Sequence, residues 1–203
     1  VWCWLRDSSA ARVNQLLERA RQIAEGAALA TGTSARVTVQ SGDWEMLPML
    51  TGAKLIHDNM MWLGPIEYTE QEQEFARQIQ RATDVEPVGL KGTPEPLDLD
   101  PHGIDGGSTD VGDVSWTVPT LHLSVTTAAA GAPWHAWPVV ATGGMSIGHK
   151  GMVYAAKTMA ATMVDLFADP EKLAEVRREF EDKTRGIEYV SFLPDGPPPI
   201  PLD

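Results

Sequence analysis

The first forty residues alternate between two strand-like segments and one long helical pattern, and this order constrains the fold more than any other feature. Residues 1–6 are rich in aromatic side chains, and residues 35–40 alternate as a half-buried strand does. Between them, apolar residues recur at helical spacing over 9–30, with Ser8 or Ser9 as the N-cap. A strand–helix–strand unit cannot cover its own sheet edges, so the pattern predicts further strands or a partner chain beside it.

The rest of the chain mixes strand-like segments with helical ones. Two segments have strand patterns: residues 120–127 and 137–142. Four have helical patterns: residues 46–63, 70–82 and 152–167, and a helix that begins at Asp169 and Pro170. Thr69 and Glu72 form a capping-box pattern at the start of the helix over 70–82. The segment 152–167 is apolar almost all round, which predicts a helix buried on most of its sides. Together these patterns predict an α/β fold.

Residues 84–110 are rich in Pro, Gly and Asp and predict a long loop, of the kind that often carries function. Asp98 and Asp100 in this loop resemble the start of a calcium-binding loop. The twelfth position would be Thr109 instead of a bidentate Glu, and Pro101 interrupts the pattern. Calcium is therefore not the favoured ligand.

Composition excludes several classes of partner. The net charge is −12, which repels the phosphates of nucleic acids and of anionic membranes. No apolar run is long enough to span a membrane, and no secretory signal opens the chain. The single cysteine, Cys3, lies in an apolar run, which predicts a buried, inert thiol, and the lack of a disulfide framework indicates a cytoplasmic protein. Because the sequence begins within a strand pattern, we expect the downstream part of a longer polypeptide.

An acidic, glycine-rich turn at 106–110 has the sequence Gly-Gly-Ser-Thr-Asp. Glycines let the backbone approach a ligand closely, and successive N–H groups in such a turn bind a carboxylate or an oxyanion. The same residues are also typical of an ordinary turn in which Asp110 accepts local N–H bonds. Composition alone leaves both interpretations open.

His135 lies between two tryptophans, Trp134 and Trp137. Imidazole is a ligand for zinc or manganese, and a dry aromatic shell would strengthen its electrostatic interactions. A lone histidine is more often a core residue whose ring nitrogens are hydrogen-bonded. A metal ligand is therefore one of two interpretations that the spacing allows.

His149 and Lys150 stand where the apolar helix begins. A cation at a helix N-terminus opposes the helix dipole unless it meets an anion, so Lys150 predicts either a substrate group or a structural carboxylate beside it. His149 is a candidate donor to substrate or a structural donor. Arg6, at the end of the first strand pattern, is suited to bind a substrate carboxylate with both prongs of its guanidinium, or to pair with Asp7.

Four segments together resemble the family of co-catalytic metallopeptidases and amidohydrolases that includes aminoacylases, glutamate carboxypeptidases and peptidase T. They are Trp-Cys-Trp-Leu-Arg at 2–6, the turn at 106–110, Gly-Ala-Pro-Trp-His-Ala-Trp at 131–137, and Gly-Gly-Met-Ser-Ile-Gly-His-Lys-Gly at 143–151. The last two are specific to the aminobenzoyl-glutamate utilisation group of that family, whereas the Gly-Gly-x-x-Asp turn is shared more widely. The resemblance covers nearly the whole chain, except the Pro-rich tail.

The resemblance implies a two-domain enzyme of which this chain is the C-terminal part. Residues 1–42 would be the second half of a small α/β lid domain that forms a homodimer by edge pairing. Residues 43–193 would be the C-terminal part of a phosphorylase/hydrolase-like catalytic α/β domain, and 194–203 an extended tail. The implied activity is metal-assisted hydrolysis of an amide bond in a small molecule of aminobenzoyl-glutamate or aminoacyl type.

The resemblance also implies roles for single residues. His135 matches the last ligand of a two-metal zinc or manganese site, whose other ligands and general-base Glu lie upstream. Arg6 matches, by position, a lid-strand Arg that contacts substrate. Gly107 and Ser108 match the turn that lines the substrate pocket, and His149 is a candidate substrate contact. No catalytic residue falls within these 203 residues, so the chain alone is expected to be inactive.

One departure concerns substrate preference. Some glutamate-cleaving relatives carry a second Arg just after the last lid strand, where this chain has Gln-Ser-Gly-Asp-Trp at 40–44. A strict preference for a glutamate-type carboxylate is therefore not implied. Two other functions stay open: a non-catalytic dimerisation module that uses the strand edges at 1–6 and 35–40, and a domain that binds small carboxylates without hydrolysis.

Overall fold

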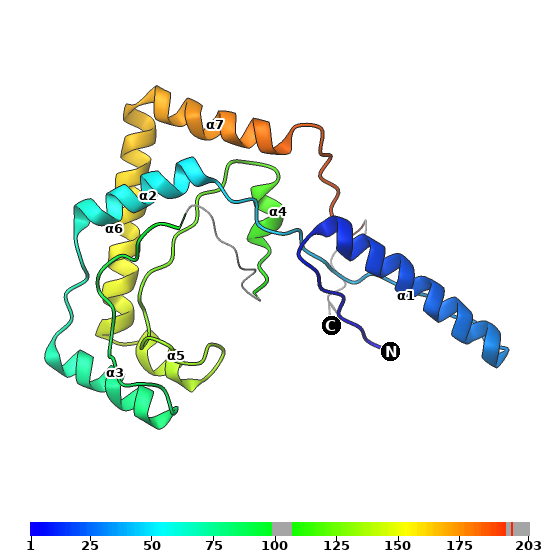
Figure 1. Ribbon diagram of the computed structural model, residues 1–203, viewed down its shortest axis with the longest axis horizontal. Coiled ribbons are helices and arrows are strands. Elements are labelled where there is room, and N and C mark those ends of the chain that lie inside the picture. The colour runs from blue at the N-terminus through cyan, green and yellow to red at the C-terminus, as the bar shows by residue number, and fades with distance from the viewer. Residues whose placement is uncertain (99–106, 194–195, 197–203) are drawn as a thin grey trace. The chain divides into compact units, whose positions relative to one another are not determined.

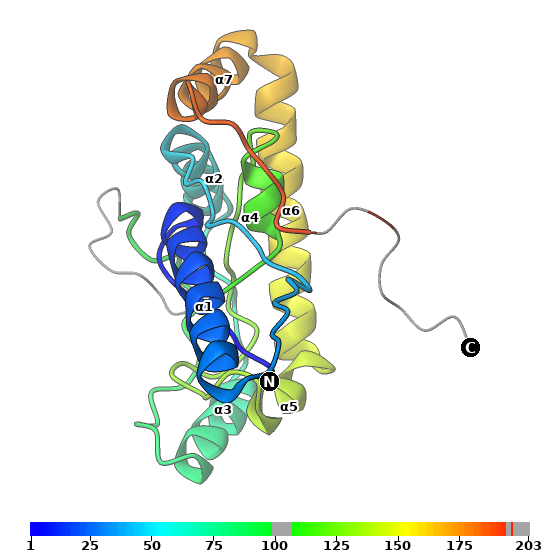
Figure 2. The same ribbon diagram turned by 90° about the vertical axis from the view of Figure 1, so that its right-hand side faces the viewer.

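The structure is a computed structural model of the chain, and it describes residues 1–98, 107–193 and 196. These residues form helices and no strand (Figures 1 and 2). The helices are α1 (Ala10–Thr31), α2 (Leu50–Leu63), α3 (Glu70–Ala82), α4 (Val111–Ser115), α5 (Trp137–Gly143), α6 (Ser146–Ala168) and α7 (Pro170–Thr184). By length and hydropathy, none of these helices meets the requirement for a bilayer-spanning segment.

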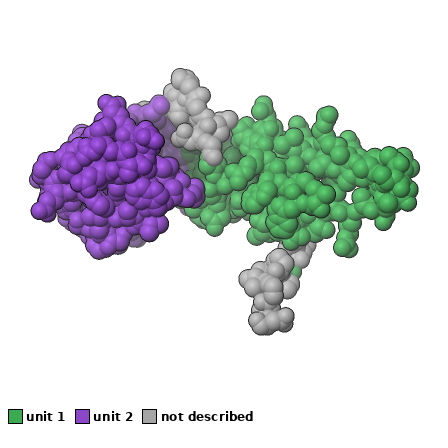
Figure 3. Space-filling model, turned by 90° about the horizontal axis from the view of Figure 1, so that it is seen from below, with its two compact units in different colours: residues 1–48, 101–120, 183–203 green, residues 49–100, 121–182 purple. Residues whose placement is uncertain are grey.

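The chain divides into two compact units (Figure 3). Unit 1 comprises Val1–Pro48, Pro101–Thr120 and Lys183–Asp203, and unit 2 comprises Met49–Asp100 and Leu121–Asp182. Each unit is therefore assembled from segments that are far apart in the sequence.

The predicted α/β fold is wrong for the described residues. A strand is stable only when a neighbour pairs with its backbone N–H and C=O groups. Residues 1–6 and 35–40 have no regular secondary structure, because neither meets a ladder partner in the described part of the chain. Cys3 in the first of these segments is exposed, which also corrects the prediction of a buried thiol.

The predicted strands at 120–127 and 137–142 are also absent. Residues 121–127 have no regular structure. Instead of a ladder of backbone hydrogen bonds, a side chain joins this segment to its neighbour: Thr126 Oγ1 donates to the Lys91 carbonyl at 2.6 Å. Residues 137–142 lie in α5 instead. Pro138 favours the first turn of a helix because it lacks the N–H that a first turn leaves unpaired, and Thr142 donates to its carbonyl at 3.2 Å.

The helix predictions are largely confirmed. The Ser9 hydroxyl accepts from the Arg12 N–H at the start of α1, and Gly32 ends that helix with φ at 65°. α3 has the bounds that the pattern predicts, and α7 begins at Pro170 as expected. α2 begins four residues later than predicted because Pro48 precedes it, and Glu179 of α7 supplies the acceptors for its first N–H groups, at Leu50 and Thr51, each at 2.8 Å.

Unit 1 is held together by an aromatic cluster. The ring of Trp44 lies 5.0 Å from that of Trp116 and 5.3 Å from that of Tyr189. The two indole N–H groups donate to backbone carbonyls, from Trp44 to Val190 at 2.9 Å and from Trp116 to Glu45 at 2.8 Å. Large rings with satisfied polar edges contribute much of the packing energy in a small unit. This cluster joins three segments that are remote in sequence.

Unit 2 is organised around α6, which contacts both α2 and α5 (Figures 1 and 2). Its apolar core consists of Ala76, Ile79, Leu90, Ala129, Ala132 and Ile147. At the other end of α6, the Asn59 amide donates to Asp165 at 2.8 Å and to Thr162 at 3.3 Å, which joins α2 to α6.

The prediction that α6 is buried on most sides is wrong. Apart from Ile147, which belongs to the core, its buried face consists of small or hydroxyl-bearing residues: Gly148, Gly151, Tyr154, Thr158 and Thr162. The threonine hydroxyls donate back to carbonyls one turn earlier, so their burial costs little. The large apolar side chains face outward: Met152, Val153, Met159, Met163, Val164 and Phe167. Periodicity could not reveal which side faces the core, because the apolar residues cover almost the whole helix.

Two glutamines of α3 bind the backbone of an extended segment. Gln73 accepts from the Leu90 N–H at 2.8 Å and donates to the Leu90 carbonyl at 3.2 Å. Gln80, which is fully buried, accepts from the Gly89 N–H at 2.7 Å and donates to the carbonyls of Gly89 and Ala130, the latter at 2.8 Å. The amides thus satisfy backbone groups that a neighbouring strand would otherwise pair with.

We expect Gln80→Ala to lower the free energy of unfolding by about 3 kcal/mol, because buried backbone groups of Gly89 and Ala130 lose their partners. Urea denaturation followed by circular dichroism measures this change. Gln78→Ala is the matched control, since Gln78 lies on the same helix and is exposed. Equal stability of the two variants would contradict the role assigned to Gln80.

α5 and α6 approach closely at Gly148. A Cβ atom on Gly148 would overlap the carbonyl oxygen of Gly143, whereas a Cβ atom on Gly143 would meet no atom within 4 Å. Gly148→Ala should therefore force the two helices apart and lower the free energy of unfolding by about 1–3 kcal/mol. Gly143→Ala, the control in the same denaturation experiment, should be neutral or stabilising. A neutral Gly148→Ala variant would show that the α5–α6 packing adjusts freely.

Candidate functional site

His135 stands in an uncommon backbone conformation just before α5. Its φ is 58°, a left-handed value that non-glycine residues seldom adopt. The side chain is exposed, as are Trp134 and Trp137 on either side. The dry aromatic shell expected from the sequence is therefore absent. Among the described residues the imidazole has no hydrogen-bond partner, so it is not the satisfied core histidine of the alternative interpretation either.

Lys150 meets a structural carboxylate, which resolves the alternative left open by the sequence. Its ammonium lies 2.6 Å from Glu72 Oε2 and donates to the Glu67 carbonyl at 2.9 Å. It also lies 5.7 Å from the centre of the Tyr68 ring. A cation at this helix start is tolerated because the Glu72 carboxylate neutralises it. His149, the neighbouring candidate, is exposed and remains available.

Glu72 is buried, with 5% of its surface exposed. Its carboxylate accepts from the Thr69 N–H at 2.7 Å, from Ser146 Oγ at 2.5 Å and from Lys150. Burial by itself would raise the pKa of Glu72, but the hydrogen bonds from Lys150, Ser146 and Thr69 outweigh it and lower the pKa to about 2. The capping box of α3, predicted from Thr69 and Glu72, is confirmed, and it is also the junction between α3 and α6.

α4, which follows the glycine-rich turn, serves the packing of unit 1. Gly107 and Ser108 are exposed, and a Cβ atom on Gly107 would meet nothing within 4 Å. Just beyond them, the buried Ser115 hydroxyl accepts from the Leu47 N–H at 2.9 Å. Asp113 accepts from the Tyr189 hydroxyl at 2.9 Å. The buried, hydrogen-bonded residues of this motif are thus those that follow the turn.

Arg6 is exposed, and its guanidinium lies 5.4 Å from the centre of the Trp4 ring. The alternative salt bridge with Asp7 does not form; Asp7 pairs instead with Arg12 at 3.5 Å. Arg6, Gly107 and Ser108 belong to unit 1, whereas His135 and His149 belong to unit 2. The five candidates therefore fall into two sets, one in each unit.

The described residues do not form a complete metal site. No group of three or more His, Cys, Asp or Glu side chains close enough to hold an ion is found in the described ranges. Zinc takes three protein ligands in catalytic sites and four in structural ones. His135 offers one nitrogen, so the described part of the chain does not fit a zinc or manganese centre by itself. The residues of the discounted calcium loop from 99 to 106 lie outside the described ranges.

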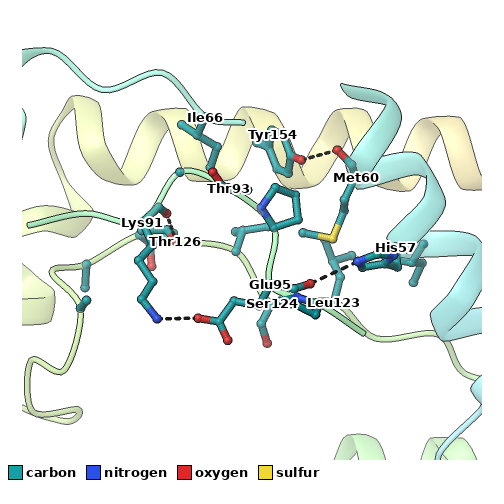
Figure 4. A pocket seen from close by; sticks show the side chains of 18 of the residues that line it. His57, Met60, Ile66, Lys91, Thr93, Glu95, Leu123, Ser124, Thr126 and Tyr154 are labelled. Atoms are coloured by element: carbon teal, nitrogen blue, oxygen red, sulfur yellow. Dashed lines mark hydrogen bonds and ion pairs between the residues drawn. The ribbon is translucent and has the colours of Figure 1, made fainter. Parts of the chain in front are cut away.

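An open groove of about 710 Å³ lies in unit 2 between α2 and the segments 91–98 and 122–132, and Trp134 lines it. Its polar groups mostly bind one another (Figure 4). Lys91 pairs with Glu95 at 2.7 Å, and His57 Nε2 lies 3.2 Å from the Glu95 carbonyl. Tyr154 donates to the Met60 carbonyl at 2.8 Å, and burial raises the pKa of its phenol. These bonds shape a groove and do not constitute a nucleophile–base pair.

Sequence reasoning missed this groove and the Glu72 junction. His57 and Glu95 are 38 residues apart and carry no common motif, so no signal connected them. Glu72 did carry a signal, the capping box, which predicted the helix start. Its partner Lys150 is 78 residues away in the sequence. The sequence indicated only that Lys150 needs an anion, not that Glu72 supplies it.

We expect the Glu72 junction to make stability depend on pH. The folded-state pKa of about 2 lies below the ordinary value of 4.5, so the stabilisation is complete above about pH 4.5 and is lost as the pH falls towards 2. Glu72→Gln should lower the free energy of unfolding by about 3 kcal/mol at pH 7 and by much less at pH 2.5. Urea denaturation at both pH values tests this. Glu86→Gln, at an exposed position, is the control, and an equal loss at both pH values would contradict the ionic origin.

The chain is similar to one of the subunits of p-aminobenzoyl-glutamate hydrolase from Escherichia coli (strain K12). The two are 33% identical over 214 aligned residues, which cover 94% of this chain and 44% of that protein. The chain thus spans less than half the length of the curated relative it matches. No family model matches the chain, and no solved structure matches it. The similarity supports the relation to a hydrolase that the motifs at 131–137 and 143–151 indicated.

Proposed function

We propose that this chain is part of a metal-dependent amidohydrolase that cleaves an amide bond in a small substrate of aminobenzoyl-glutamate or aminoacyl type. The observation that carries the proposal is the similarity to a hydrolase subunit, which extends over 94% of the chain. The relative is more than twice as long as the part that matches. Residues that the chain lacks for catalysis would then come from polypeptide outside these 203 residues.

His135 is the residue that we assign to the metal. It is exposed, has no partner in the described part of the chain, and is fixed by a left-handed backbone next to the first turn of α5. An exposed imidazole with both nitrogens unpaired is ready to accept a ligand role. The metal, zinc or manganese, would polarise the amide carbonyl and activate water when bound. His135 would supply one ligand, and the others would come from outside this chain.

The remaining candidates would bind the substrate. The Arg6 guanidinium is exposed and pairs with no carboxylate in the described residues, so it is available to an anionic group. Gly107 and Ser108 present exposed backbone, and His149 presents an exposed imidazole at the start of α6. These roles follow from the resemblance and from accessibility.

A second function, a dimerisation module, is favoured by unit 1. It exposes Trp2, Trp4, Ile23 and Leu29 within the segment 1–42. Large exposed apolar side chains in one segment are typical of a surface that contacts a partner. Pairing of two copies through this segment is compatible with the hydrolase proposal and does not require activity.

The hydrolase proposal is tested with a hybrid in which this chain replaces the matching part of the E. coli protein. We expect the hybrid to hydrolyse p-aminobenzoyl-glutamate, measured as release of p-aminobenzoate. His135→Ala should lower the rate by more than about 100-fold, because loss of a metal ligand costs more than loss of its supporting hydrogen bonds.

The control is His122→Ala, which removes another exposed imidazole of unit 2. Circular dichroism establishes that each variant is folded, and metal content is measured alongside the rate. A folded His135→Ala hybrid that retains its metal and its rate would remove His135 from the site. A folded, metal-loaded hybrid without activity on aminobenzoyl or aminoacyl amides would contradict the proposed function.

A further inference from the structure

The outward face of α6 is an apolar surface that the core of unit 2 does not use. Six apolar side chains lie on it: Met152, Val153, Met159, Met163, Val164 and Phe167. Val164 is 65% exposed and Phe167 is 84% exposed, so these side chains project into solvent along most of their length. Single exposed apolar residues are ordinary, but a continuous row of this size marks a contact surface.

The geometry of the helix concentrates these residues. At about 100° per residue, the six positions fall within an arc of about 140° around the helix axis. The buried positions, such as Thr158 and Tyr154, lie on the opposite side. Between Lys150 and Asp165 the only charged residue is Lys157. The helix therefore presents its most apolar face to solvent and its small, hydroxyl-bearing face to its own core, which is the reverse of a solvent-exposed helix.

We propose that this face of α6 is covered by the polypeptide that corresponds to the part of the E. coli protein outside the matched region. That part amounts to more than half of the relative, so enough chain exists to cover a helix of 23 residues. A second copy of this chain is the competing occupant, and its binding would appear as self-association of the isolated chain through this face. The inference rests on the proposed function in one respect: both assume that this chain is part of a longer protein related to the E. coli hydrolase subunit.

The proposal is tested by thiol labelling. In a Cys3→Ser background, Met159→Cys places a single thiol midway along the length of the face, and Gln78→Cys places one at an exposed polar position of α3 in the same unit. In the isolated chain both thiols should label at similar rates. In the hybrid with the E. coli polypeptide, Met159→Cys should label at least about tenfold more slowly, whereas Gln78→Cys should not change.

A substitution gives an independent readout. Val164→Lys should leave the unfolding midpoint of the isolated chain unchanged, since the side chain is already in solvent, but should lower the midpoint of the hybrid. Gln78→Lys adds the same charge elsewhere and should lower neither. Unchanged labelling of Met159→Cys in a folded hybrid would overturn the proposal. So would self-association of the isolated chain that Val164→Lys abolishes, because it would assign the face to a second copy.

The labelling result can be told apart from the test of the proposed function. Hydrolysis of p-aminobenzoyl-glutamate is measured on the same hybrid samples. Protection of Met159→Cys without hydrolysis would keep the covered face and reject the substrate assignment. Hydrolysis without protection would keep the function and overturn the covered face.

Discussion

The architecture of unit 2 depends on the buried carboxylate of Glu72. A buried charge is tolerated only when its oxygens are fully hydrogen-bonded and a counter-charge is close. Glu72 meets both conditions, with donors from Thr69, Ser146 and Lys150. Because these donors belong to the starts of α3 and α6, the carboxylate fixes the two helix starts against each other. α5 packs on α6 near the same end, so the position of His135, just before α5, follows from this junction.

The small residues of α6 have the complementary role of allowing close approach. A Cβ atom on Gly151 would meet the Thr126 carbonyl oxygen, and one on Gly148 would overlap the carbonyl of Gly143. Two glycines of the motif at 143–151 thus have a packing reason within this unit. Lys150 in the same motif has a structural partner as well. Of the residues at the start of α6, His149 is the one that the internal packing leaves to other uses.

Local signals predicted the helices well, because caps, prolines and periodicity act within a few residues. Ser9, Thr69 and Pro170 each mark a helix start that the structure confirms. The strands were mispredicted because pairing is a long-range property, and an alternating pattern at 35–40 does not supply a neighbour. Tertiary partners such as Glu179 at the start of α2 carry no sequence signature. For the site, the pattern identified Lys150 as a cation in need of an anion but could not choose between substrate and Glu72.

The distribution of satisfied and unsatisfied groups supports a chain that works together with other polypeptide. Among the described residues, no buried side-chain nitrogen or oxygen lacks a hydrogen-bond partner, so the internal polar network is complete. The groups suited to chemistry, such as His135, His149 and Arg6, are all on the surface and outside that network. The most apolar face of the longest helix is also on the surface. A self-sufficient domain would bury such an apolar face and enclose such chemical groups. A domain that completes a site with another segment must present both on its surface.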